Sequence, residues 1–198
     1  RLLSVSTTMP AVTTPATSPH TPPPMKFGAA PTSTLAPSTG APPEVPQPTA
    51  APAVLTLLAP WQNGATVPAR YTCDDADLSP ALTWTNLPAG AVEIAITMVD
   101  LDAGFTHWAI GGIDLDRTGL VEGEVPEGAI VYANDFGDVG WAGPCPPPGD
   151  AAHTYAFTVH ALNQQLEVAD DASAAEVVDA LNQTAIAQGS VSGVYGRA

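Results

Sequence analysis

Two aspartates and two histidines are the strongest candidates for a functional site in this sequence. Asp100 and Asp102 lie two positions apart after an apolar run, and His107 and His153 each open an alternating stretch. Paired carboxylates could act as general acid and base in a hydrolase, and an Asp/His set could bind a metal ion. Imidazoles could instead hydrogen-bond a bound anion. An equally consistent interpretation makes the aspartates turn residues and the histidines satisfied core donors, so the residues alone leave these alternatives open.

A proline-rich loop precedes the second histidine. Residues 143–149 are Gly-Pro-Cys-Pro-Pro-Pro-Gly, and Tyr155 follows His153 two positions later. A stiff loop that runs into a strand is typical of a wall that holds a site in shape. The sequence shows no activated nucleophile, since Ser79 precedes Pro80 and has no local base. We therefore expect a site that binds rather than an enzyme.

The composition divides the chain into two segments. Residues 1–53 hold 13 of the 22 prolines and only three charged residues, which predicts a disordered linker rich in Pro, Thr, Ala and Ser. Residues 54–198 hold all four Trp and all four Tyr, as a folded domain would. The formal net charge of -15 argues against nucleic acid and anionic lipid surfaces as partners. No run approaches the ~20 apolar residues of a membrane-spanning helix, so we expect no membrane span in this sequence.

Residues 54–198 are expected to form a mainly β domain. Alternating or short apolar runs, bounded by turn residues, predict strands over 54–58, 81–84, 93–100, 107–113 and 154–162. One helix is expected after Ser173, which forms a capping box with Glu176. We expect Gly189 to end this helix as its C-cap. Apolar residues recur at helical spacing in between, at Val177, Val178, Leu181 and Ala185.

Several motifs, taken in this order, resemble the phosphatidylethanolamine-binding protein family, and most closely its bacterial branch of Raf-kinase-inhibitor-like (YbhB/YbcL-type) proteins. An opening signature lies at 71–84. The later motifs are Asp100-Leu101-Asp102-Ala103, His107-Trp108, Asn134-Asp135-Phe136-Gly137, Gly140-Trp141-Ala142-Gly143-Pro144-Cys145-Pro146-Pro147 and His153-Thr154-Tyr155. The likeness covers residues 54–198. It implies a large antiparallel sheet packed on a smaller sheet, with a short C-terminal helix.

The resemblance also implies a small surface pocket for an anion such as phosphate or a phospholipid headgroup. Matching the family motifs residue by residue places six residues in this pocket: Asp100, Asp102, His107, Pro144, His153 and Tyr155. We expect no metal and no cofactor there, and each imidazole is expected to donate one N–H to the anion. Affinity should rise as pH falls through about 6.5, because protonation adds donors and positive charge. The alternative function is a protein-interaction module that inhibits a protease or a kinase-type partner through the pocket rim.

Three positions depart from the family pattern at this pocket. Leu101 and Gly104 stand where the family has prolines, which predicts a less rigid pocket edge. Thr154 replaces the usual Arg and removes a cation that could brace a neighbouring carboxylate. Residues 54–198 carry three arginines against 19 acidic residues, so an anion would depend on local hydrogen-bond donors.

The two cysteines, Cys73 and Cys145, have no second cysteine or histidine near them at zinc spacing. From the residues alone they would pair in an exported protein, or stay buried as thiols in a cytosolic one. The resemblance places both in loops at the pocket end, and the linker suggests export, so we expect one disulfide. We accordingly expect a bacterial protein outside the cytoplasm, secreted or tethered to the envelope. A signal peptide or lipid anchor upstream of Arg1 would fit this interpretation.

Overall fold

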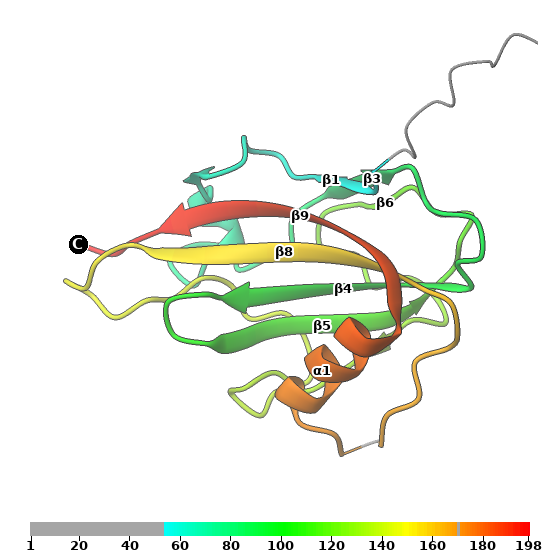
Figure 1. Cartoon of the computed structure of the whole chain (residues 1–198). Helices are drawn as coiled ribbons and strands as arrows, with labels where there is room; N and C mark the ends of the chain where they lie inside the picture. The colour runs from blue at the N-terminus through cyan, green and yellow to red at the C-terminus, as the bar shows by residue number, and fades with distance from the viewer. Residues whose placement is uncertain (1–53, 170) are drawn as a thin grey trace, which may run out of the picture. The chain divides into compact units, whose positions relative to one another are not determined.

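The computed structural model describes residues 54–169 and 171–198. The linker expected over residues 1–53 lies outside these described residues. The long strands of the larger of two sheets run through the middle of the domain (Figure 1). In chain order the elements are β1 (Thr56–Leu58), β2 (Ala65–Thr66), the 3-10 helix η1 (Ala69–Tyr71), β3 (Leu82–Thr85), β4 (Glu93–Asp100), β5 (Phe105–Ile113), β6 (Gly119–Leu120), β7 (Ile130–Val131), β8 (His153–Leu162), α1 (Ala174–Thr184) and β9 (Ala185–Tyr195).

The two sheets differ in size. The larger sheet has the strand order β2-β9-β8-β4-β5-β7, and only the short pairing of β2 with β9 is parallel. The smaller sheet has the order β1-β3-β6 and is antiparallel. This arrangement confirms the expected mainly β fold of a large sheet, a smaller sheet and one short C-terminal helix. All five expected strands are present, with ends shifted by at most two residues.

One apolar cluster joins the two sheets, because alternate strand residues face the space between them. Leu57 of β1 and Trp84 of β3 share this cluster with Ile96 of β4 and Phe157 of β8, and each is at most 3% exposed. Full burial of an aliphatic or aromatic side chain contributes roughly 1.5–3 kcal/mol. The cluster therefore fixes the long strands whose ends carry the candidate site residues.

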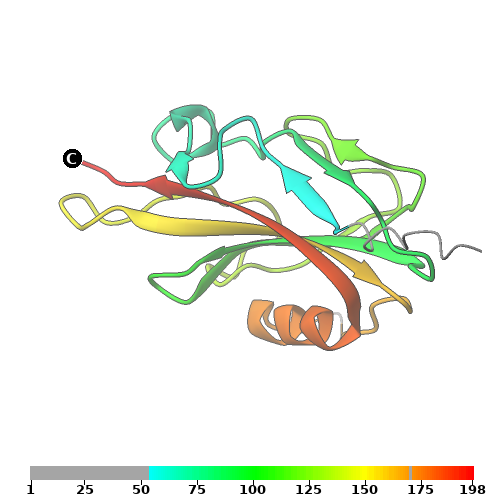
Figure 2. The same cartoon turned by 45° about the horizontal axis from the view of Figure 1, so that its top comes forward.

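Helix α1 covers the opposite face of the large sheet (Figure 2). It begins as predicted: the Ser173 hydroxyl accepts from the backbone N–H of Glu176, and the Glu176 carboxylate accepts from the backbone N–H of Ser173. Val177 and Leu181 are fully buried in a second apolar cluster that includes Ala95 of β4. In the part of the chain that the structure describes, no helix is long and apolar enough to cross a membrane.

The end of the helix differs from the sequence prediction. Helix α1 ends at Thr184, and Ala185 begins β9 without an intervening loop. The assignment of Gly189 as the C-cap is therefore wrong, since this residue lies in the middle of β9. A close backbone approach explains the glycine, because a Cβ atom on Gly189 would lie 2.5 Å from the carbonyl oxygen of Leu55. The apolar pattern does not predict β9 itself, since its many Ala, Gly and Ser residues have weak strand propensity.

Candidate functional site

A small pocket of about 140 Å³ opens at one end of the large sheet. Asp100 is the last residue of β4, and its cross-strand partners are Phe105 of β5 and Tyr155 of β8. This register brings the ends of three neighbouring strands to one point. The pocket is lined by Asp100, Ala103, Phe105, His107, Phe136, Cys145, Pro146, Pro147, His153 and Tyr155.

Four of the six residues expected in the pocket line it: Asp100, His107, His153 and Tyr155. The other two, Asp102 and Pro144, support its walls instead. The Asp102 carboxylate accepts a hydrogen bond from the backbone N–H of Thr154 at 2.6 Å. The Pro144 carbonyl accepts one from the backbone N–H of Cys73 at 3.3 Å. The first contact ties the turn after β4 to β8, and the second ties the proline-rich loop to the loop after η1; neither residue is among those that line the pocket.

His153 and Asp100 form a hydrogen-bonded pair in the pocket wall. Nδ1 of His153 lies 2.7 Å from Oδ2 of Asp100, and Oδ1 accepts from the backbone N–H groups of Asp102 and Ala103. Burial raises the pKa of Asp100, but these hydrogen bonds outweigh burial and leave that pKa below its ordinary value. The hydrogen bond to the Asp100 carboxylate in turn raises the pKa of His153. Since a carboxylate only accepts, Nδ1 carries a hydrogen and Nε2 is left for a ligand.

The Asp100 carboxylate also orders the turn after β4, where Leu101 and Gly104 replace the family's prolines. The turn after β4 closes on Oδ1 of Asp100 through two backbone N–H groups, at 2.9 and 3.0 Å. The N–H of Leu101 donates to the Thr154 carbonyl, and Gly104 adopts a φ of 64° that suits glycine. Hydrogen bonds therefore order this edge without prolines. The side chain of Leu101 is left 59% exposed.

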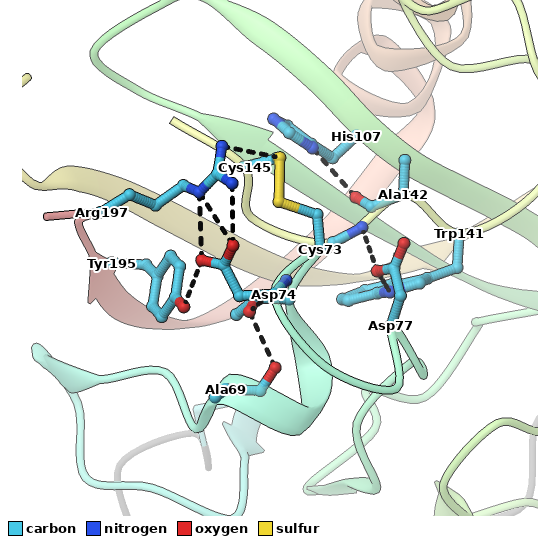
Figure 3. The surroundings of a disulfide bond; sticks show 12 residues. Ala69, Cys73, Asp74, Asp77, His107, Trp141, Ala142, Cys145, Tyr195 and Arg197 are labelled. Atoms are coloured by element: carbon cyan, nitrogen blue, oxygen red, sulfur yellow. Dashed lines mark hydrogen bonds and ion pairs between the residues drawn. A yellow bond between two sulfur atoms is a disulfide. The ribbon is translucent and has the colours of Figure 1, made fainter. Parts of the chain in front are cut away.

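His107 lies deeper, among aromatic rings. Its ring centroid is 5.1 Å from that of Phe105, 5.5 Å from Phe136 and 5.3 Å from Tyr155, and the side chain is buried. Nδ1 lies 2.9 Å from the carbonyl oxygen of Ala142 and donates to it (Figure 3). Burial lowers the pKa of His107, against the opposing effect of that carbonyl and of nearby carboxylates. The ring is therefore neutral near pH 7.

These contacts correct one expectation about the ligand. Each imidazole was expected to offer an N–H to the anion, but the Nδ1–H groups of His107 and His153 both bond within the protein. A neutral imidazole then presents only a lone pair on Nε2, and it becomes a donor there only after protonation. Protonation is easier at His153, whose pKa is raised, than at His107, whose pKa is lowered.

Tyr155 adds a neutral hydroxyl to the pocket. Its side chain is fully buried, and among the described residues its hydroxyl makes no hydrogen bond of ordinary geometry, although the Asp100 carboxylate and the backbone of Cys145 lie nearby. Burial, followed by the nearby Asp100 carboxylate, raises the pKa of Tyr155 far above its ordinary value. A buried hydroxyl without a partner costs about 1–3 kcal/mol. The arrangement leaves this O–H available to an acceptor placed in the pocket.

A disulfide ties the proline-rich wall to the loop after η1 (Figure 3). Cys145 lines the pocket and is joined to Cys73, with Cα atoms 5.5 Å apart, so the structure contains the expected pair. Oδ1 of Asp77 accepts from the backbone N–H of Gly143 at 2.8 Å and from Nε1 of Trp141 at 3.1 Å. The wall is thus held at Cys145 by the disulfide, and just before Cys145 by the hydrogen bonds to Asp77.

Two aromatic lining residues are absent from the sequence prediction. Phe136 lies within the motif at 134–137, so the family likeness contains a signal for its position in the pocket. Phe105 stands at the start of β5, and no local pattern distinguishes it from an ordinary strand residue. Both rings make the pocket more apolar than its one carboxylate and two imidazoles suggest.

Among residues 54–169 and 171–198, no group of three or more His, Cys, Asp or Glu side chains is placed to hold a metal ion. The fold and the site define a two-sheet β protein with a small pocket, partly polar and partly aromatic, at one end of its larger sheet.

Comparisons with known proteins identify the family. A family model described as phosphatidylethanolamine-binding protein matches residues 59–196. A UPF0098 protein of Methanothermobacter thermautotrophicus is 37% identical over 139 residues, covering 66% of this chain and 91% of that protein. A Mycobacterium tuberculosis protein named "Putative lipoprotein LppC" is 34% identical over 154 residues, covering 76% of this chain and 75% of that protein.

A solved structure agrees with these matches. The crystal structure of Escherichia coli YbcL superposes with a TM-score of 0.68 and 29% sequence identity, covering 74% of this chain and 100% of that chain. The chain belongs to the phosphatidylethanolamine-binding protein family, and the likeness to YbcL confirms the branch that the motifs indicate.

Proposed function

We propose that the domain is a non-catalytic binding module that holds a small oxyanion, such as phosphate or a phospholipid headgroup, in the pocket between His107 and His153. The observation that carries the proposal is the fully buried Tyr155 hydroxyl, which lacks a partner among the described residues and lines the pocket. An oxygen of a bound anion would accept from this hydroxyl and remove the free-energy cost of leaving it unpaired.

The pair of His153 and Asp100 supplies the second donor. The Asp100 carboxylate favours the protonated form of His153, which then carries an N–H on Nε2 and a positive charge. The pocket volume of about 140 Å³ suits a group of a few heavy atoms rather than a whole lipid. Its lining contains no Ser, Thr or Lys, and its cysteine is in a disulfide, so it offers no free hydroxyl of Ser or Thr, no thiol and no amine as a nucleophile.

The place of action that we propose is outside the cytoplasm, secreted or tethered to the cell envelope. The structure holds a disulfide between Cys73 and Cys145, and such bonds persist in oxidising compartments. The relative LppC is named as a lipoprotein, which agrees with a tethered form.

Calorimetric titration of the full chain with phosphate and with phosphoethanolamine tests the binding proposal. Affinity is expected to fall as pH rises through the elevated pKa of His153, above about 6.5, because protonated His153 is the donor that is lost. His153→Ala is expected to weaken binding at least about ten-fold through loss of a charged hydrogen bond. His160→Gln is the matched control, since His160 lies on the same strand but outside the pocket lining.

Two outcomes would contradict the binding proposal. Affinity that grows with rising pH would exclude a protonated histidine as the donor. Binding that disappears on adding a chelator would indicate a metal site, because a metal needs neutral imidazoles and is lost on acidification.

The rim of the pocket favours a second candidate function, inhibition of a protease or kinase-type partner. Leu101 and Phe136 are 59% and 56% exposed, and exposed apolar side chains of this size are common in protein interfaces. The variant Leu101→Ser, at a rim residue outside the pocket lining, should then weaken capture of a serine protease by the immobilised full chain, while phosphate binding stays. No capture by the wild-type chain would refute this candidate.

A further inference from the structure

The backbone carbonyl of Ala142 determines which ring nitrogen of His107 carries the hydrogen. A backbone carbonyl can only accept, so Nδ1 of His107 carries the hydrogen that bonds Ala142 at 2.9 Å. Figure 3 shows the other ring nitrogen, Nε2, pointing away from Ala142. Within the described part of the chain no residue hydrogen-bonds this nitrogen, and the histidine lines the pocket. In the neutral ring Nε2 is therefore a hydrogen-bond acceptor available to a ligand.

The surroundings keep this ring neutral. It is 4% exposed and lies among three aromatic rings, so an imidazolium there would lose most of its hydration. The charged groups that face it are Asp100 at the end of β4, Asp135 in the loop after β7, and His153 on β8. The two carboxylates favour the cation, but burial outweighs them and lowers the pKa of His107.

The pocket thus presents groups of opposite hydrogen-bonding character. Tyr155 offers an O–H and protonated His153 an N–H, and both require acceptor oxygens on the ligand. Nε2 of His107 requires a hydrogen from the ligand. An oxyanion without a hydrogen would place a lone pair of its own against that of Nε2, which leaves both unpaired in a partly dry site.

We propose that the pocket selects oxyanions that still carry an acidic O–H, namely hydrogen phosphate and singly protonated phosphomonoesters, with that O–H donating to Nε2 of His107. This inference rests on the proposed oxyanion-binding function and narrows it. Sulfate and phosphodiesters have no such hydrogen. The intact diester of a phospholipid is therefore disfavoured, while phosphate, phosphoethanolamine and any other phosphomonoester share the favoured chemistry.

Competing ligands titrated into the full chain separate these classes. At about pH 6 a phosphomonoester is roughly half singly protonated, since its second pKa is about 6. Phosphate and phosphoethanolamine are expected to bind at least about ten-fold more tightly than sulfate or dimethyl phosphate, because a site built for a ligand hydrogen rejects analogues that lack it. Phosphate and phosphoethanolamine measured side by side distinguish the free ion from the headgroup as the better ligand.

A variant assigns the selectivity to His107. The carboxamide of His107→Gln can turn its NH2 group toward the ligand, so the preference for phosphate over sulfate should shrink several-fold. His153→Ala should weaken phosphate and sulfate binding alike and leave their ratio close to that of the wild type. A ratio in His107→Gln equal to the wild-type ratio would overturn the assignment.

Nitrogen-15 NMR of the ligand-free chain tests the inference even if His107→Gln fails to fold. The Nδ1–H form of His107, with a bare Nε2, is expected near pH 7, and a hydrogen found on Nε2 would overturn the proposal. Equal affinity of the wild type for phosphate and sulfate would also overturn it, while the binding function would stand. Failure of phosphate, phosphoethanolamine, sulfate and dimethyl phosphate alike to bind would overturn the binding function and this inference together.

Discussion

Replacing His160 by Gln should remove a large part of the acid sensitivity of this domain. His160 lies in β8 on the face toward α1 and is 2% exposed. Its Nδ1 is 3.1 Å from the side-chain Nε2 of Gln188, and its Nε2 is 3.1 Å from Oγ1 of Thr97. The amide nitrogen of Gln188 only donates, so Nδ1 of His160 accepts and Nε2 donates its hydrogen to Thr97. Both ring nitrogens are satisfied only while the ring is neutral.

Burial lowers the pKa of His160 to about 4, against about 6.5 in an unfolded chain. Because the pKa of His160 is lower in the folded state, protonation of this residue favours the unfolded chain. The free energy of unfolding is therefore at its full value above about pH 6.5 and decreases as pH falls toward about 4. The full difference corresponds to about 3 kcal/mol, and between pH 8 and pH 5 about 2 kcal/mol of it should disappear.

Urea unfolding of the wild type and of His160→Gln at about pH 8 and pH 5 measures this difference. The variant is expected to be the less stable protein at the higher pH but to lose about 2 kcal/mol less between the two values. His153→Gln is the matched control with the opposite sign, since the pKa of His153 is raised and its stabilising effect is lost as pH rises. Equal losses of stability in the wild type and in His160→Gln would show that His160 does not cause this acid sensitivity.

Three further predictions concern the frame of the site. Replacing Cys73 and Cys145 together by Ser should lower the free energy of unfolding by about 4 kcal/mol in the chain-entropy model, and an unchanged urea midpoint would contradict this. Gly143→Ala would place a Cβ atom next to Oδ1 of Asp77, so we expect the melting temperature to fall and phosphate affinity to weaken; wild-type values for both would contradict the packing. Ser173→Ala should reduce stability by about 1 kcal/mol through loss of the capping box, and calorimetry should find phosphate affinity unchanged.

The sequence predicts most of the fold because its strands carry strong local patterns. The run at 93–100 is apolar, and the run at 154–162 alternates and contains β-branched and aromatic residues, so both appear as predicted. The region from 185 to 195 lacks such a pattern. There Gly189 lies against the backbone of Leu55, and Gly193 lies against the side chains of Val67 and Trp61, too close for a Cβ atom. In a sequence alone, glycine more often indicates a turn or an interruption of a strand. Contacts between segments distant in the sequence, rather than a local pattern, therefore determine strand β9.

The candidate site is predicted less completely, for a related reason. Motif likeness places Asp100, His107, His153 and Tyr155 at the pocket, where the structure has them. The orientation of a side chain depends on partners from other elements, so the same likeness cannot show that Asp102 bonds to a neighbouring strand. The hydrogen positions on the imidazoles also depend on such partners, a carbonyl in one case and a carboxylate in the other.

The strongly acidic domain and the anion pocket are compatible if binding relies on directed hydrogen bonds rather than on net charge. In the described residues each arginine is already paired with a carboxylate: Arg70 with Glu122, Arg117 with Glu124 and Arg197 with Asp74. The charge that Asp100 brings into the pocket is offset by the proton that it favours on His153. A ligand that keeps a hydrogen for His107 has one negative charge fewer than its fully ionised form. Such a ligand meets less repulsion from the surrounding acidic residues, so the acceptor on His107 and the charge of the domain favour the same protonation state.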